Sequence, residues 1–132
     1  FADTGRSTVW RVALSETDGW PVGDPEVYLD RNGLDRYPDG AVCDSEGNLW
    51  VAEWGGARVT CFAPDGRELR HISVGGRHSS CPAFGGDGLS TIFVTTARQD
   101  LSRDIIAAEP QNGCVFAADA GTTGLPEPRV LL

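Results

Sequence analysis

The sequence predicts an all-β fold of the β-propeller type, and three observations lead to this prediction. The 17 glycines and 8 prolines separate short apolar runs, which favours a fold with many turns over a helical bundle. Residues 38–59 alternate turn residues with apolar runs and predict strand, turn, strand, turn, strand. Similar units recur at a spacing of about 40–50 residues, as in propeller blades. Because one such meander cannot bury both of its faces alone, several must stack around an axis.

The most complete unit covers residues 37–76, a four-stranded antiparallel meander. Its strands are expected at residues 38–44, 49–52, 58–62 and 69–74. The turns between them are formed by Ser45-Glu46-Gly47-Asn48, Gly55-Gly56 and Asp65-Gly66. Hairpin turns require these residue types, and the loops lack the regular oxygen ligands of a calcium-binding EF-hand. We therefore interpret them as turns.

Two less complete units flank it, at residues 1–30 and 79–120, and residues 121–132 form a closing segment. The first unit lacks a counterpart of the strand at residues 38–44, which would leave an apolar edge exposed. We therefore expect residues 1–132 to be the C-terminal part of a longer propeller, with about two and a half to three blades. A polar insertion at residues 98–111 interrupts the third unit and is expected to form a loop able to cover the propeller's channel. Residues 130–132 are expected to form a last strand.

Charge and cysteine content narrow the function classes. A net charge of −8 argues against nucleic-acid binding, which relies on clustered Lys and Arg. No apolar run is long enough to cross a bilayer and no signal-peptide pattern opens the chain, so we expect a soluble protein without a membrane partner. The chain has four cysteines, Cys43, Cys61, Cys81 and Cys114. They are too widely spaced in the sequence for a zinc knuckle or a redox pair. We therefore expect buried or half-buried free thiols in the cytoplasm, although the even number of cysteines leaves disulfides open.

An ordered set of motifs resembles the SMP-30/gluconolactonase/LRE family, which includes regucalcin and bacterial sugar lactonases. The motifs are Phe1-Ala2-Asp3-Thr4 with Val9-Trp10-Arg11, Tyr37-Pro38-Asp39-Gly40, Glu46-Gly47-Asn48-Leu49-Trp50-Val51-Ala52, Gly56-Ala57-Arg58-Val59, and Phe84-Gly85-Gly86 with Val94-Thr95-Thr96-Ala97-Arg98. The resemblance implies a six-bladed propeller that hydrolyses sugar lactones with one divalent metal ion, namely Ca, Zn, Mn or Fe(II).

Asp39 is the residue to which this resemblance assigns chemistry. By itself, Pro38-Asp39-Gly40 is typical of a turn, but the resemblance implies that Asp39 is a metal ligand that also takes a proton from the attacking water. The remaining ligands implied by the family, a Glu and an Asn, would lie upstream of Phe1. One carboxylate cannot hold a divalent ion alone, so the chain by itself is expected to be inactive.

Other candidate residues are assigned to the substrate channel. Pro82 and Phe84 occupy the expected inner strand of the third unit, and His78 lies just before it. No Gly-x-Ser-x-Gly motif is present, which excludes a serine hydrolase of the nucleophile-elbow type. Trp10 and Trp50 are expected to pack between blades, whereas Trp54 is expected to be the most exposed of the four tryptophans.

Two functions are compatible with these features. The first is a metal-dependent lactone hydrolase with a small sugar lactone as substrate. The second is a non-catalytic propeller or half-propeller that serves as a binding or assembly module, completed by a second copy of the chain or by a separate N-terminal half.

Overall fold

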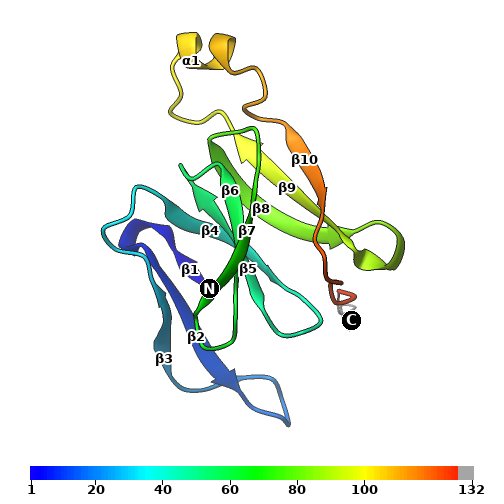
Figure 1. Ribbon diagram of the computed structural model, residues 1–132. Coiled ribbons are helices and arrows are strands. Elements are labelled where there is room, and N and C mark those ends of the chain that lie inside the picture. The colour runs from blue at the N-terminus through cyan, green and yellow to red at the C-terminus, as the bar shows by residue number, and fades with distance from the viewer. Residues whose placement is uncertain (128–132) are drawn as a thin grey trace.

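The computed structural model describes residues 1–127, and nearly all regular structure in it is β (Figure 1). Every strand pair is antiparallel. The strands are β1 (Ala2–Asp3), β2 (Thr8–Leu14), β3 (Pro21–Asp30), β4 (Tyr37–Cys43), β5 (Leu49–Trp54), β6 (Arg58–Phe62), β7 (Glu68–Ser73), β8 (His78–Gly85), β9 (Thr91–Ala97) and β10 (Val115–Asp119). The predicted all-β class is confirmed.

The strands form three consecutive meanders. The first contains β1, β2 and β3, the second β4 to β7, and the third β8, β9 and β10. A single residue pair, Trp54 opposite His78, joins the second and third meanders into one seven-stranded sheet. The predicted blade boundaries at 1–30, 37–76 and 79–120 stay a prediction, and the predicted strand at residues 130–132 lies outside the described residues.

One short helix, α1 (Arg103–Ala108), lies in the polar insertion of the third meander. The side chain of Ser102 caps it by accepting a hydrogen bond from the backbone N–H of Ile105 at 3.2 Å. Figure 1 shows α1 at the top of the view, beyond β9 and β10. Two 3₁₀ turns, η1 (Thr4–Arg6) and η2 (Asp87–Leu89), complete the regular structure of the described residues. Within residues 1–127, no helix is long and apolar enough to cross a membrane.

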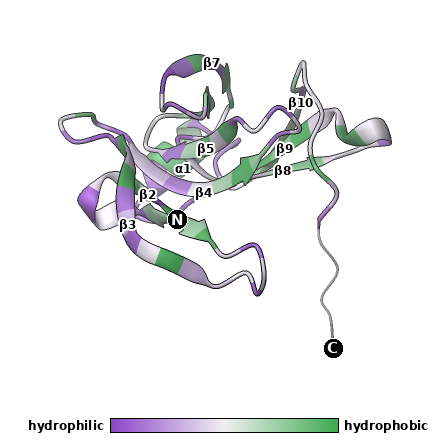
Figure 2. Ribbon diagram, turned by 90° about the horizontal axis from the view of Figure 1, so that it is seen from below, coloured by the Kyte–Doolittle hydropathy of each residue, from purple (hydrophilic) through white to green (hydrophobic). Residues whose placement is uncertain are grey.

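Strands β5 and β6 of the second meander are buried on both faces of the sheet, to which successive residues of a strand point alternately. Trp50, Val59 and Cys61 pack with Ile92, Val94 and Ala120 of the third meander and its continuation. On the other face, Val51 and Phe62 pack with Val9 and Leu29 of the first meander. Figure 2 shows the corresponding hydrophobic segments of β8 and β9 side by side. The predicted stacking of meanders is therefore what buries the core.

Two side-chain predictions need correction. Only Cys61 is buried, whereas Cys43, Cys81 and Cys114 are exposed free thiols. Trp50 is fully buried as predicted, but the most exposed tryptophan is Trp20, at 71%. Trp54 is half-buried because its ring stacks on His78, with centroids 4.3 Å apart and planes at 18°.

Strand β4 passes very close to β8 at Gly40. A Cβ atom at this position would lie 2.7 Å from the backbone oxygen of Ser80 and 2.9 Å from the Cα of Cys81. These are backbone atoms, which cannot rotate out of the way as the end of a flexible side chain can. Gly40 therefore allows the first strands of two successive meanders to approach each other.

We expect Gly40→Ala to lower the free energy of unfolding by about 1–3 kcal/mol, because overpacking must push β4 and β8 apart. Gly5→Ala is the matched control, since the nearest atom to its added Cβ would lie 3.8 Å away. Urea unfolding of the two variants measures the difference. Equal stability of both variants would contradict the close approach of β4 and β8.

Candidate functional site

Two cavities meet at Asp39 and Thr4, which line both of them. The larger, of about 730 Å³, is a mostly apolar groove between β1–β2 and β4–β5. The smaller, of about 300 Å³, is lined by Thr4, Asp39, Trp54, Gln99 and Asp100. The smaller cavity therefore contains carboxylate, carboxamide and hydroxyl groups together with one aromatic ring, which is a suitable combination for a small polar ligand.

A β-bulge places Asp39 at this junction. Pro38 pairs with Glu53 and Ala41 pairs with Val51. Two residues of β4, Asp39 and Gly40, therefore lie opposite the single residue that separates Val51 from Glu53 on β5. A bulge of this kind bends the strand and changes where a side chain points. The hydroxyl of Thr4 donates a hydrogen bond to the backbone oxygen of Pro38 at 2.8 Å, which fastens η1 to the start of β4.

The carboxylate of Asp39 is half-buried, and burial raises its pKa above the ordinary value of 3.8, although the backbone N–H of Gly40 acts in the opposite direction. Within residues 1–127, neither Asp39 nor Asp100 takes part in an ion pair. A cavity-lining carboxylate whose pKa is raised by burial is a candidate for a functional role. Asp39 can act as a proton acceptor or as a ligand for a cation.

The fit of a divalent metal ion to the described residues is partial. Asp39 provides a carboxylate of the type that hard cations prefer, and its lack of a cationic partner among residues 1–127 is consistent with that role. However, residues 1–127 contain no group of three or more His, Cys, Asp or Glu side chains arranged to hold a metal. The described residues can therefore supply part of a coordination shell and not a complete one.

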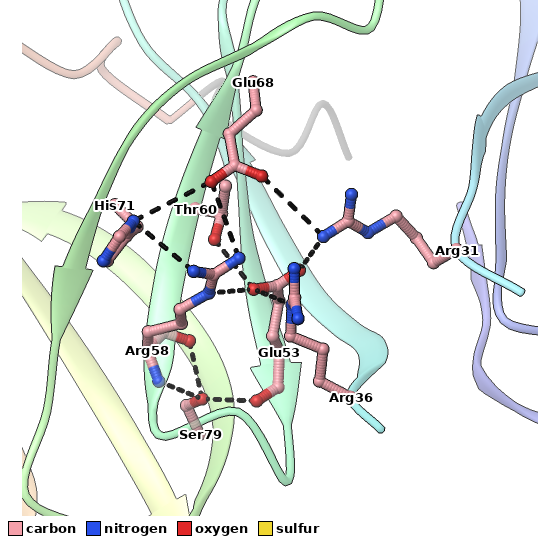
Figure 3. Close-up of polar contacts among 8 residues, drawn as sticks. All are labelled: Arg31, Arg36, Glu53, Arg58, Thr60, Glu68, His71 and Ser79. Carbon is pink, nitrogen blue, oxygen red and sulfur yellow. Dashed lines mark hydrogen bonds and ion pairs between the residues drawn. The ribbon is translucent and has the colours of Figure 1, made fainter. Parts of the chain in front are cut away.

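A second carboxylate near the same end of the sheet is fully neutralised. Glu53 of β5 is 2% exposed. Its oxygens lie 2.5 Å from Nη2 of Arg31 and 3.1 Å from Nε of Arg36, and they also accept a hydrogen bond from Nε of Arg58. These arginines follow β3, precede β4 and open β6, respectively. Figure 3 shows their guanidinium groups gathered around Glu53.

Neighbouring polar groups extend this cluster. The hydroxyl of Thr60 donates a hydrogen bond to the Glu53 carboxylate at 2.9 Å. The hydroxyl of Ser79 donates one to the backbone oxygen of Glu53, also at 2.9 Å. Glu68 and His71 lie on the exposed side of the cluster (Figure 3). Burial acts to raise the pKa of Glu53, but the hydrogen bonds from Arg58, Thr60 and Arg31 outweigh it, so that the pKa is lowered.

The acidic turn after β4 is a hairpin turn, as predicted. Asp44 is 1% exposed, and its carboxylate accepts hydrogen bonds from the backbone N–H of Asn48 at 2.9 Å and from Nε1 of Trp50 at 3.0 Å. Although burial alone would raise its pKa, these hydrogen bonds lower it. Because the carboxylate accepts these protein N–H groups, we assign Asp44 a structural role.

The predicted site residues lie in different places. Asp39 lines both cavities, but Pro82, Phe84 and His78 are not among the residues lining either one. Phe84 packs edge-on against Trp50 in the core, with ring centroids 6.1 Å apart. His78 supports the ring of Trp54. A channel role for these three residues stays a prediction.

Sequence reasoning missed Thr4, Gln99 and Asp100 as companions of Asp39. Gln99 and Asp100 belong to the polar insertion, which was predicted only as a loop able to cover the channel. Contact between residues about 60 positions apart depends on how the two meanders pack, and no local pattern in the sequence reports it. The positive φ of 60° at Asp100 also could not be predicted from the sequence.

The chain is similar to known proteins over most of its length. The family model described as SMP-30/Gluconolactonase/LRE-like region matches residues 1–98. The 6-deoxy-6-sulfogluconolactonase of Pseudomonas putida is 36% identical over 127 residues, which cover 96% of this chain and 43% of that protein. The L-arabinolactonase of Azospirillum brasilense is 41% identical over 111 residues, covering 84% of this chain and 36% of that protein.

A solved structure has the same fold. Regucalcin of Agrobacterium tumefaciens, named a calcium-binding protein, superposes with a TM-score of 0.93 at 38% sequence identity, over 98% of this chain and 44% of that one. The prediction of a β-propeller fold is thereby confirmed. The chain spans less than half of the length of the relatives that it matches.

We expect Glu53→Gln to lower the free energy of unfolding by about 3–5 kcal/mol at pH 7, because it leaves three half-buried arginines with only the exposed Glu68 as counter-charge among residues 1–127. Since the pKa of Glu53 is lowered from 4.5, its stabilising contribution is complete above pH 4.5 and is lost as the pH falls through the lowered value. Urea unfolding at pH values from 7 down to below 4.5 measures this loss.

Glu26→Gln is the control, because it removes an exposed ion pair to Arg11. It should lower the free energy of unfolding by less than about 1 kcal/mol. An equal loss of stability in both variants would argue against a stabilising role of the Glu53 cluster.

At Asp39, in contrast to Glu53, ionisation of the carboxylate is expected to lower the stability of the fold. Because its pKa is raised from 3.8, ionisation destabilises the folded state at neutral pH and no longer does so below pH 3.8. In a chelator such as EDTA, Asp39→Asn should therefore raise the melting temperature at pH 7, and the gain should shrink as the pH approaches 4. The control Asp24→Asn changes an exposed carboxylate of β3. A lower melting temperature for Asp39→Asn than for this control would show that Asp39 is a structural carboxylate.

Proposed function

Because the chain belongs to the SMP-30/gluconolactonase/LRE-like family, we propose that it forms part of a hydrolase that acts on sugar lactones. The observation that supports this most directly is the desolvated carboxylate of Asp39, without a cationic partner among the described residues, at the junction of two cavities. Two relatives that are at least 36% identical to the chain over the aligned residues are named as lactonases.

Lactone hydrolysis requires a water molecule to lose a proton while its oxygen attacks the ester carbonyl. The ring C–O bond then breaks, and the leaving oxygen takes up a proton to give a hydroxy acid. We assign to Asp39 the role of the group that accepts the proton from water. A carboxylate is a better proton acceptor when its pKa is raised towards the working pH, and the burial of Asp39 shifts its pKa in that direction.

Asp39 is also proposed as one ligand of a divalent cation, for which Ca, Zn, Mn and Fe(II) are the candidates. When bound, such a cation polarises a carbonyl oxygen and lowers the pKa of a coordinated water molecule. The Agrobacterium relative is named a calcium-binding protein. The rest of the coordination shell is proposed to come from the portion of the relatives' length that this chain does not span.

We expect Asp39→Asn to lower kcat/KM for D-glucono-1,5-lactone and D-xylonolactone by about 10²- to 10⁴-fold, the range that a general base contributes. The assay uses the protein that carries this chain, with each of the four cations added in turn. Base titration of the released acid measures turnover.

Asp24→Asn is the control, because Asp24 is exposed on β3 and lines neither cavity. Unchanged turnover by Asp39→Asn would reject the assigned role of Asp39. A parent protein that hydrolyses neither lactone with any of the four cations would support the alternative, a non-catalytic binding or assembly module.

A further inference from the structure

The loop after β9 adds two polar side chains to the cavity of Asp39. Gln99 and Asp100 follow β9 directly, and both line the 300 Å³ cavity together with Thr4, Asp39 and Trp54. The cavity is therefore formed by residues of all three meanders and their connections. A ligand bound beside Asp39 would lie against Gln99 and Asp100 as well.

This loop is firmly anchored at both of its ends. At one end, Nε of Arg98 donates to the backbone oxygen of Asn112 at 2.7 Å. Asn112 is itself 0% exposed, and its Oδ1 accepts a hydrogen bond from the backbone N–H of Arg77 at 2.8 Å. Arg77 also pairs with Glu109, at 2.6 Å from Nε to Oε2. These contacts tie both ends of the loop to Arg77, directly before β8.

The backbone at Asp100 adopts a left-handed conformation, with φ of 60°. Asp is among the non-glycine residues that adopt this conformation most readily, and glycine also tolerates it. Asp100 is exposed and lines the cavity, so its carboxylate is available to a ligand there.

Trp54 forms the apolar part of the same cavity and is held in position by His78. The two rings stack with their planes at 18°, and Nδ1 of His78 lies 3.1 Å from the backbone oxygen of Gln99. Trp54, His78 and the loop after β9 therefore form one connected wall. We call the three residues of this wall that line the cavity, namely Trp54, Gln99 and Asp100, the loop wall.

We propose that the loop wall recognises the ring hydroxyl groups of the substrate, and so selects polyhydroxylated lactones over unsubstituted ones. The carboxylate of Asp100 accepts hydrogen bonds from hydroxyl groups, Gln99 can both donate and accept them, and the indole of Trp54 offers an apolar face to the C–H groups of a sugar ring. This inference rests on the proposed lactonase function and extends it, because it assigns substrate selection to residues other than Asp39.

The test compares D-glucono-1,5-lactone with δ-valerolactone, which has the same ring without hydroxyl groups. A hydrogen bond to a charged group accounts for about 10- to 100-fold in affinity. In Asp100→Gly, which removes the carboxylate and tolerates the positive φ, we expect the ratio of the two kcat/KM values to fall by about that factor through a higher KM for the hydroxylated lactone. Asp18→Gly is the control, because Asp18 is an exposed turn residue that lines neither cavity.

A second measurement does not depend on hydrolysis. The probe 1,5-anhydro-D-glucitol carries the hydroxylated ring without a carbonyl, and calorimetry should show that Asp100→Gly raises its Kd by about 10- to 100-fold. An unchanged lactone ratio in Asp100→Gly, or no binding of the probe to the parent, would overturn the loop wall while leaving lactone hydrolysis intact. Probe binding that depends on Asp100, in a parent that hydrolyses neither lactone, would support the loop wall and reject the proposed function.

Discussion

The structure depends on the neutralisation of one buried carboxylate, that of Glu53, by three arginines. Arg31, Arg36 and Arg58 come from the end of the first meander, the approach to β4 and the start of β6. Removing a carboxylate from water is costly unless its charge is compensated by well-placed partners. The compensation can occur only when these segments meet, so the Glu53 cluster couples the packing of the first meander to the end of β5 (Figure 3).

Asp39 and Glu53 illustrate two uses of a carboxylate at the same end of a sheet. Pro38 is the pairing partner of Glu53, so the cluster holds the strand immediately before the bulge that carries Asp39. The pKa of Glu53 is lowered, whereas that of Asp39 is raised by burial. We infer that the carboxylate of Glu53 stabilises the fold. The carboxylate of Asp39 is kept available for chemistry, at a cost in stability that functional sites commonly carry.

The sequence was sufficient for the features that depend on local patterns. Turn residues and alternating apolar runs predicted the strands of residues 38–62. Asp39 was singled out by the family resemblance, because Pro38-Asp39-Gly40 by itself is typical of a turn. Local patterns could not reveal features that arise from packing between meanders. The position of Asp100 beside Asp39, the inward packing of Phe84 against Trp50 and the convergence of three arginines on Glu53 all depend on contacts across the fold. The helix α1 was missed because six residues are too few to show a helical period.

We infer that the carboxylate of Asp39 binds the cation of a lactonase site in the cavity that it shares with Asp100. Anomalous diffraction from crystals of the protein that carries this chain, soaked with Mn²⁺, is the most direct test of this binding. A cation bound in this way gives a peak about 2.0–2.6 Å from an oxygen of Asp39, inside the cavity lined by Thr4, Trp54, Gln99 and Asp100. A peak elsewhere, with the carboxylate of Asp39 paired to a basic side chain, would contradict it.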